Sequence, residues 1–148
     1  MANLFPVDTD FEEFDIQSNK EVEFKGSYKF DFNKGEFVKN IDGTIAMCNE
    51  DEAYIQWCQK VMRTPRFLLA YSDLFGHEID SLRGSKLSRE AIELEVKRMT
   101  KEALMVHPKT IDVDNFKFTW YDGNLYYEYN VNSYYNNSTL SNELKVRW

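Results

Sequence analysis

Residues 63–79, RTPRFLLAYSDLFGHEI, contain side chains of the types that nucleophilic catalysis uses. Ser72 could act as a nucleophile with His77 as its base, and Asp73 or Asp80 could orient that base. Such a triad needs a rigid local frame, for example the GxSxG turn of hydrolases, and the segment has no comparable motif. We therefore interpret residues 63–79 as a connection whose polar residues face solvent or a partner. The apolar residues that we expect to pack on a sheet are Phe67, Leu68, Leu69 and Tyr71.

The acidic run Glu50-Asp51-Glu52 is a second candidate for chemistry. Glycoside hydrolysis uses two carboxyl groups, one of them with a raised pKa, on either side of the scissile bond. However, Asn49 and Glu52 have the spacing of a helix capping box. Acidic residues in a first helical turn also interact favourably with the helix dipole. We therefore expect these carboxylates to begin a helix, and we predict no catalytic residue in the chain.

The positions of cysteine and histidine argue against a metal or cofactor site. Cys48 and Cys58 do not form a CxxC pair, so a zinc site or a disulfide framework has little support and buried free thiols are expected. His77 and His107 do not lie in an HExxH pattern. We predict that the protein binds neither a metal nor a cofactor.

Composition and charge limit the class of protein. The chain has 148 residues, 43% of them hydrophobic, which is enough for one domain with its own core. Nucleic-acid binding would need clustered Lys and Arg, and the formal net charge is −7, so we expect no nucleic-acid partner. No apolar run approaches the roughly 20 residues of a membrane span, and the N-terminus lacks the order of a secretory signal. We expect a soluble protein, made in the cytosol, with no membrane partner.

Residues 1–26 are interpreted as an acidic N-terminal arm. They contain seven acidic residues and two lysines, a net −5, which leaves −2 for the remaining residues. The stretch DTDFEEFDIQ places Phe11, Phe14 and Ile16 among five acidic residues, a composition too charged to fold alone. The arm could be a solvated extension, or it could become ordered on a partner. Residues 27–148 would form the single domain.

The elements that must position these side chains begin after Gly26. Residues 28–32 alternate aromatic and polar, and Gly35 can take the positive φ of a tight turn before a second short strand. A further turn at Asp42-Gly43 leads into another short extended segment, TIAMC. This part of the chain is therefore predicted to be a small β-structure.

Two helices follow from apolar periodicity and capping residues. The first is predicted over roughly 50–63 and ends before Pro65, and the second over roughly 89–106, between Ser88 and Pro108. The residues between the helices, 66–87, are expected to be a long connection. The predicted apolar faces are Ala53, Trp57 and Val61, flanked by Tyr54, Cys58 and Met62, on the first helix, and Ile92, Val96, Met99 and Ala103 on the second. The predicted surface pairs on the second helix are Glu93–Lys97 and Arg98–Glu102.

The C-terminal third contains the most specific local pattern. A two-residue turn at Asp122-Gly123 would set a hairpin register in which all the pairs on one face are apolar or aromatic and Lys117 faces Glu128. The pairs expected on that face are Trp120–Leu125, Phe118–Tyr127 and Phe116–Tyr129. Ile111 and Val113 keep alternation but are out of phase with Phe116, which predicts a bulge near Asp114-Asn115. After the polar loop YYNNS, residues 144–148 alternate again and predict a third strand that could be an edge.

Together these elements predict an α+β fold in which two main helices pack on an antiparallel, hairpin-rich sheet within a single domain. The order of several motifs also resembles the XkdS-type family of prophage tail proteins, over about residues 28–133. The motifs are YKFDFNKGEFV, DEAYIQWCQKVMRTPRFLLAYSDLFGHEIDSLRG, EALMVHP and IDVDNFKFTWYDGNLYYEYNV. That family is similar to the small, sometimes lysozyme-like, baseplate wedge protein of contractile phage tails and to the corresponding component of type VI secretion baseplates.

The resemblance implies a structural role in an assembly. A protein of this kind joins the other wedge subunits at the inner baseplate and starts polymerisation of the contractile sheath. The implied partners are other baseplate wedge proteins and the tail sheath protein, with tube or hub proteins as further candidates, in a ring of about six copies. The implied location is the baseplate of a phage tail or of a tail-like bacteriocin, assembled in the bacterial cytoplasm.

The resemblance also implies where partners would bind. Related wedge proteins carry a Glu-Pro-Arg signature after the second helix, where this chain has His107-Pro108-Lys109; Lys lacks the planar fork of Arg, and His does not replace a carboxylate. A strand from a sheath subunit would pair with an open strand edge. The residues that match the family more closely, and where we expect the wedge-docking surface, are Thr64, Arg66, Tyr71, Gly76 and Glu78. The residues expected at the sheath-facing edge are Leu144, Val146 and Trp148, with the neighbouring hairpin edge as the alternative.

Two other functions remain open at the level of sequence. A tail-associated cell-wall hydrolase would clear labelled cell wall and would lose that activity on substitution of a single carboxylate. A small cytosolic binding module unrelated to phage is also compatible with the predicted hairpin and helices. Neighbouring genes for tube, sheath and large wedge proteins are expected only if the protein functions in tail assembly.

Overall fold

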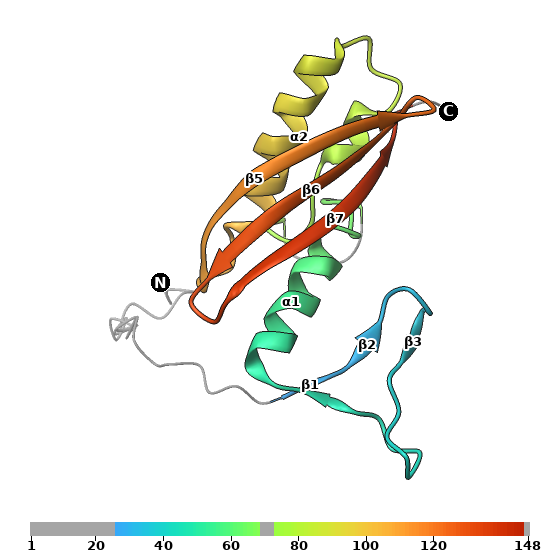
Figure 1. Ribbon diagram of the computed structural model, residues 1–148, viewed down its shortest axis with the longest axis vertical. Helices are drawn as coiled ribbons and strands as arrows, with labels where there is room; N and C mark the ends of the chain where they lie inside the picture. Colours follow the sequence, from blue (N-terminus) through green and yellow to red (C-terminus); the bar gives the residue numbers. More distant parts are fainter. Residues whose placement is uncertain (1–25, 69–72, 147–148) are drawn as a thin grey trace, which may run out of the picture.

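An antiparallel sheet packed against two helices forms the body of the protein, and a small β-structured appendage, residues 26–48, projects from it (Figure 1). The computed structural model describes residues 26–68 and 73–146. The fold is α+β, which confirms the predicted class. The elements are β1 (Ser27–Tyr28), β2 (Phe30–Asp31), β3 (Glu36–Phe37), β4 (Met47–Cys48), α1 (Glu50–Val61), η1 (Ile79–Leu82), α2 (Arg89–Leu104), β5 (Thr110–Tyr121), β6 (Asn124–Ser133) and β7 (Asn137–Lys145).

The main sheet has the strand order β5-β6-β7. Asp122 and Gly123 both have positive φ, 51° and 77°, as a two-residue hairpin turn of type I′ requires. The observed register confirms the central part of the predicted hairpin. The confirmed pairs are Trp120–Leu125, Phe118–Tyr127 and Lys117–Glu128.

Two irregularities interrupt strand β5. The predicted register pair Phe116–Tyr129 is wrong, because the register shifts between Asp114 and Lys117 and Asn115 takes a φ of 52°. This is the bulge that the change of phase predicts. The two rings still stack, with their centroids 5.5 Å apart. A second shift, between Thr110 and Asp112, leaves Ile111 exposed while Val113 is buried, so the expected alternation of these two residues is also wrong.

A third strand is present, as predicted, but β7 runs from Asn137 to Lys145, so only residues 144 and 145 of the predicted range, 144–148, are shown to belong to it. It pairs with β6 without a register shift from Asn137 to Lys145, so part of the predicted polar loop belongs to the strand. Its sequence, NSTLSNELK, has only two apolar residues, Leu140 and Leu144, and both are buried against the core. The strand lies at the edge of the sheet, as predicted.

Helix α1 begins as its capping residues predict. The Asn49 N–H donates to Glu52 Oε2 at 3.2 Å. Tyr54, Cys58, Val61 and Met62, all on the predicted apolar side, are buried, whereas Trp57, which was expected at the centre of that side, is only partly buried. The Cys58 thiol is free, and burial raises its pKa to about 12, so it stays protonated.

Helix α2 lies behind the sheet in Figure 1, along β5. The Ser88 side chain accepts a hydrogen bond from the Ala91 N–H at 3.2 Å, which confirms the predicted cap. The predicted inward residues Ile92, Val96 and Ala103 are buried, and Met99 packs on the core from its margin.

Surface pairs on α2 follow the prediction in part. Arg98 and Glu102 form the predicted ion pair at 3.0 Å. Glu93 instead accepts a hydrogen bond from Trp120 Nε1 at 2.8 Å, and Lys97 lies over the ring of Phe116. These contacts tie the helix to strand β5. Within the described ranges, neither helix is long and apolar enough to cross a membrane.

The appendage is organised around a three-way backbone junction. The Lys29 N–H donates to the Ala46 carbonyl, the Ala46 N–H to the Val38 carbonyl, and the Val38 N–H to the Lys29 carbonyl. The donor–acceptor distances are 2.8–2.9 Å. From this junction extend the predicted β2–β3 hairpin, a second turn at residues 40–43, and the β1–β4 pair. The predicted small β-structure is therefore present, with Gly35 and Gly43 both at positive φ.

Candidate partner-binding surfaces

The predicted residues Thr64, Arg66, Gly76 and Glu78 lie together and hold the two ends of one loop. The Arg66 N–H donates to the His77 carbonyl at 2.8 Å, and the His77 N–H donates to the Thr64 carbonyl at 3.0 Å. Thr64 is buried, and its hydroxyl donates to the Lys60 carbonyl at 2.7 Å. These bonds close the loop onto the end of α1.

The Arg66 guanidinium connects this loop to α2. It lies 3.3 Å from the Glu102 carboxylate, 3.9 Å from Glu78 and 3.2 Å from the Gly76 carbonyl. Only 9% of the Arg66 side chain is exposed. A buried charge is stabilised only when such partners surround it, so Arg66 fixes the position of the loop on the body.

The loop closed by these contacts presents apolar side chains to solvent. The exposed fractions are 60% for Phe67, 76% for Leu68 and 65% for Leu74. The prediction that Phe67 and Leu68 pack on the sheet is therefore wrong, because the polar residues at the loop ends take the inward positions. Leu69, Tyr71 and Ser72 lie outside the described residues. Neighbouring exposed apolar side chains of this kind are common at protein–protein interfaces.

The geometry around His77 gives no support to a catalytic triad. Its Nδ1 atom accepts a hydrogen bond from the Ile79 N–H at 3.1 Å, and burial lowers its pKa. Asp80 forms an ion pair with Arg83 at 3.6 Å, and Asp73 is exposed in the loop. Among residues 26–68 and 73–146, no group of three or more His, Cys, Asp and Glu side chains is placed to hold a metal ion.

Trp57 brings the second predicted segment, residues 107–109, close to this loop. Its ring lies 4.7 Å from the His107 ring and 6.3 Å from the Phe75 ring, measured between centroids. The Nδ1 atom of His107 accepts from the Lys109 N–H at 3.0 Å, and burial, with the charge of Lys109, lowers the pKa of His107. His107 is therefore neutral at pH 7.

Exposed apolar side chains also flank residues 107–109. Pro108 and Lys109 are exposed, and the Lys109 carbonyl accepts from the Tyr134 N–H at 3.0 Å. The neighbouring exposed residues are Met105, Val106, Ile111 and Tyr134, with exposed fractions from 41% to 72%. The ring contacts of Trp57 thus bring residues 66–68 and 73–76 near residues 105–111, and the exposed side chains of these segments form one surface. We call it the loop surface.

The predicted residues near the C-terminus lie elsewhere. Strands β5 and β7 run in the same direction, so the end of β7 is at the opposite end of the sheet from residues 107–109. Leu144 is buried, so its side chain is not free for a partner, and the Val146 side chain is half-buried. Trp148 lies outside the described residues. A partner at this strand would meet the backbone and the exposed residues instead.

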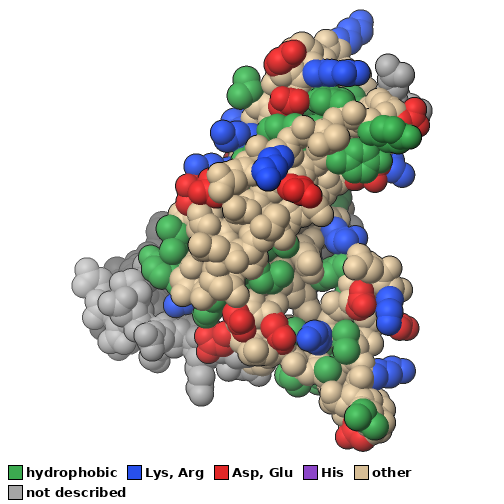
Figure 2. Space-filling view, in the orientation of Figure 1, with side chains coloured by type: hydrophobic (Ala, Val, Ile, Leu, Met, Phe, Trp, Pro, Cys, Tyr) green, Lys and Arg blue, Asp and Glu red, His purple; other side chains and the backbone are tan. Residues whose placement is uncertain are grey.

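The two edges of the sheet differ in how well they could accept another strand. Edge strand β5 contains both bulges, and side chains of α2 lie along it, for example Lys101, whose Nζ is 2.9 Å from Asp112. Bulges and covering side chains are the usual means of blocking an edge. Edge strand β7 is regular over its whole length. The solvent-facing side chains of β7 are polar, and only Glu143 and Lys145 among them are charged. The front of the sheet in Figure 2 is mostly tan, the colour of backbone and of uncharged polar side chains.

The hairpin turn determines which backbone N–H and C=O groups of β7 point away from the sheet. In a two-residue turn the closing residues Tyr121 and Asn124 bond to each other, and bonding alternates along antiparallel strands. Even-numbered residues of β6 therefore bond to β5, and odd-numbered residues bond to β7. With the observed pairing, the residues of β7 whose N–H and C=O point away from the sheet are Asn137, Thr139, Ser141, Glu143 and Lys145.

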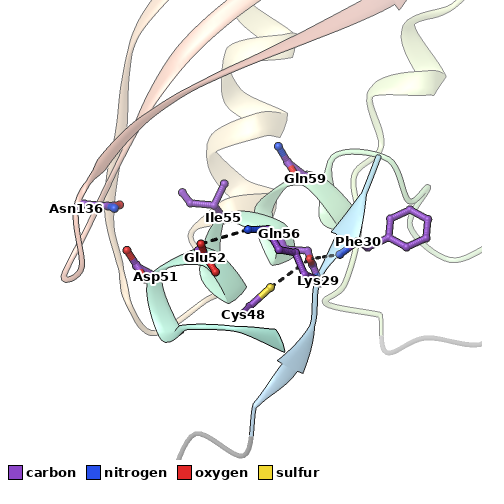
Figure 3. Close-up of a pocket in the computed structure, with 9 residues that line it drawn as sticks. All are labelled: Lys29, Phe30, Cys48, Asp51, Glu52, Ile55, Gln56, Gln59 and Asn136. Atoms are coloured by element: carbon purple, nitrogen blue, oxygen red, sulfur yellow. Dashed lines mark hydrogen bonds and ion pairs between the residues drawn. The ribbon is translucent and has the colours of Figure 1, made fainter. Parts of the chain in front are cut away.

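The appendage is held on α1 by Gln56, a residue whose role the sequence did not indicate. The Gln56 side chain accepts from the Phe30 N–H at 2.9 Å and donates to the Tyr28 carbonyl at 2.8 Å. It thus bonds to the strand as another strand would. Figure 3 shows Gln56 beside Lys29, Glu52 and Cys48, around a hollow of about 270 Å³ between α1 and the appendage.

The family of the chain follows from comparison with known proteins. Residues 26–136 match the family described as contractile injection system sheath initiator. The chain belongs to this family. The expected relation to sheath-starting tail proteins is thereby confirmed, whereas the narrower likeness to XkdS-type proteins stays a prediction. No curated protein matches the chain. This sheath initiator is a component of a contractile injection system, and the match gives no support to the hydrolase alternative.

Proposed function

We propose that this sheath initiator is bound into a baseplate through its loop surface and offers the outer edge of β7 to the first sheath subunits. The family match supports a role in sheath assembly. The observation that carries the finer proposal is the regular outer edge of β7, which pairs with no other strand among the described residues. The matched residues end just before this strand, so the choice of β7 rests on the structure.

An edge of this kind would bind one sheath strand weakly, and every copy in a ring would bind its strand in the same way. Each backbone hydrogen bond contributes only about 0.5–1.5 kcal/mol net, so one docked strand binds weakly. A ring of about six copies, as the family resemblance implies, would engage several sheath subunits at once and make their binding much tighter. A ring that carries no sheath subunits yet would then be able to start a sheath, although a single copy binds a sheath subunit only weakly.

A proline at position 141 tests the use of this edge. Ser141→Pro removes an outward N–H, and edge strands tolerate proline because the lost donor does not bond within the sheet. We expect sheathed tails to fall at least about fivefold, and much further if several edges must act together, since each docking loses a bond and gains a steric obstacle. Negative-stain electron microscopy of assembled particles would measure this fraction. Ser141→Ala is the matched control and should assemble normally; equal sheath assembly with Ser141→Pro would contradict the proposal.

The loop surface is proposed to dock on other baseplate wedge subunits. Leu68 is 76% exposed beside Phe67, and the Arg66 contacts hold both in place. Leu68→Asp places a charge on this surface without touching the core, so the fold should persist while incorporation into baseplates falls at least about tenfold. Leu94, 68% exposed on α2, provides the matched control Leu94→Asp. Quantitative immunoblotting of purified baseplates measures incorporation, and equal incorporation of both variants would contradict this docking surface.

A further inference from the structure

We propose that Arg83 and Gly84 act as a stop at the end of β7 and thereby fix the register of the docked sheath strand. This inference rests on the proposed function of the β7 edge and adds a specificity-determining device to it. The Arg83 Nε–H donates to the Lys145 carbonyl at 3.1 Å. The Gly84 N–H donates to the Val146 carbonyl at 3.0 Å.

The bond from Arg83 occupies the outer edge where the strand ends, and the bond from Gly84 lies one residue beyond the strand. The Lys145 carbonyl is one of the groups that the sheet geometry directs outward, and it is already bonded to Arg83. A strand that arrives along β7 can bond to the outward groups of Asn137, Thr139, Ser141 and Glu143. It cannot continue past Lys145 unless Arg83 is displaced.

The stop itself is rigidly supported. Arg83 forms an ion pair with Asp80 at 3.6 Å, and its N–H donates to the Asp80 carbonyl at 3.1 Å. Helix η1, which contains Asp80, is anchored by Ile79 and Leu82, exposed by only 3% and 5%. Gly84 takes a φ of 71°, a conformation that glycine adopts without strain. The stop is therefore linked to η1, an element that packs in the core.

A stop is needed because the exposed side of β7 does not define a register. Register is set where apolar residues must face a core, and it is weakly set along a uniformly polar strand. The solvent-facing side chains of β7 are those of Asn, Thr, Ser, Glu and Lys, with no apolar residue among them. An incoming strand could slide by two residues and recover almost the same bonds. A fixed obstacle at Lys145 removes that freedom.

Photo-crosslinking on intact baseplates tests this stop. The photoreactive amino acid p-benzoylphenylalanine would replace Thr139, Glu143 or Lys145 singly, all exposed positions, and the sheath protein of the same particle would be the probe. Mass spectrometry would identify the sheath residues that are linked. In the wild-type background we expect positions 139 and 143 to crosslink to single sheath positions, and position 145 to crosslink at least fivefold less.

The Arg83→Gln variant should change this pattern, because it removes the Nε–H donor and the ion pair with Asp80. The crosslinks from 139 and 143 should spread to sheath positions two residues away, and the yield at 145 should rise at least threefold. Arg83→Lys keeps the charge beside Asp80 but lacks the Nε–H, and should show the same spread. Arg98→Gln, on the outer side of α2, is the control and should leave the crosslinks unchanged. Thermal melts of each variant verify folding.

The possible results separate the stop from the function on which it rests. Strong crosslinking at 145 in the wild type, or an unchanged register in both Arg83 variants, would overturn the stop while leaving the β7 edge in use. Sheathed particles without any crosslink to sheath protein from 139 or 143 would overturn the proposed use of β7 itself.

Discussion

Gly76 determines, at the scale of one residue, whether the loop surface can form. Its φ is 107°, and a Cβ atom at this position would lie 2.6 Å from the Thr64 carbonyl oxygen. The close backbone approach is the same one that lets His77 bond to Thr64 and Arg66. A side chain here would therefore separate the two ends of the loop.

Substitution of Gly76 by alanine should cost more than the same change at Gly35. Both residues have positive φ, but around Gly35 no atom lies within 4 Å of the added Cβ. We expect Gly76→Ala to lower the free energy of unfolding by about 2–4 kcal/mol, and Gly35→Ala by about 1 kcal/mol. Urea unfolding monitored by tryptophan fluorescence measures both, and equal losses would contradict the close approach.

His77 makes the stability of the loop depend on pH. Burial lowers the pKa of His77; Asp80 opposes this and Arg66 adds to it. The unfolded chain therefore binds a proton that the folded chain does not, so stability is fully present above the ordinary histidine pKa of about 6.5 and is lost as the pH falls further. The loss should reach at most about 1.4 kcal/mol per pH unit for this residue.

The variant His77→Asn isolates this contribution. Asparagine offers an oxygen acceptor to the Ile79 N–H but does not titrate. Between pH 7 and 5.5 the variant should lose less stability than the wild type, and the remaining slope would come from His107, whose pKa is also lowered. Urea unfolding at a series of pH values gives the two slopes, and identical slopes would show that His77 is not the titrating group.

At the scale of elements, the sequence predicts what local chemistry determines. The Asp122-Gly123 turn sets the hairpin register, and Ser88 begins α2, because each depends on residues close together in the chain. The bulge at Asn115 could be located from the change of phase, but its effect on Phe116 could not, because the register beyond a bulge depends on where the extra residue sits.

Elements determined by contacts between distant segments were harder to predict. Strand β7 contains mostly Asn, Ser and Thr, and it is a strand because β6 supplies its bonding partners. Likewise, the exposure of Phe67 and Leu68 follows from the inward position of Arg66, which depends on Glu102 far along the chain. The Gln56 side chain bonds to the appendage as a neighbouring strand would, and no sequence pattern indicates that role.

At the scale of the whole molecule, the proposed surfaces lie apart from each other. The loop surface is near the beginning of β5, whereas the outer edge of β7 leads to the opposite end of the sheet. The core between them is continuous and includes both helices and all three strands of the main sheet. A partner bound at the loop surface would therefore hold the β7 edge in a defined orientation, as the start of an ordered sheath requires.

The number of edges needed to start a sheath can be tested with mixed rings. Baseplates assembled from wild-type protein and Ser141→Pro protein in varied ratios would contain both kinds of copy. If several edges must act together, the fraction of sheathed tails should fall much more steeply than in proportion to the blocked copies. For about six copies that are all required, half substitution would leave about one ring in sixty competent.

Mixtures with Ser141→Ala protein control for the mixing itself and should give a constant fraction of sheathed tails, counted by electron microscopy. A fall that is strictly proportional to the blocked fraction would show instead that each edge recruits sheath protein independently. In that case a single strand pairing would have to hold a sheath subunit by itself. The bonds available along β7 would then have to contribute more than the modest energy of exposed backbone hydrogen bonds.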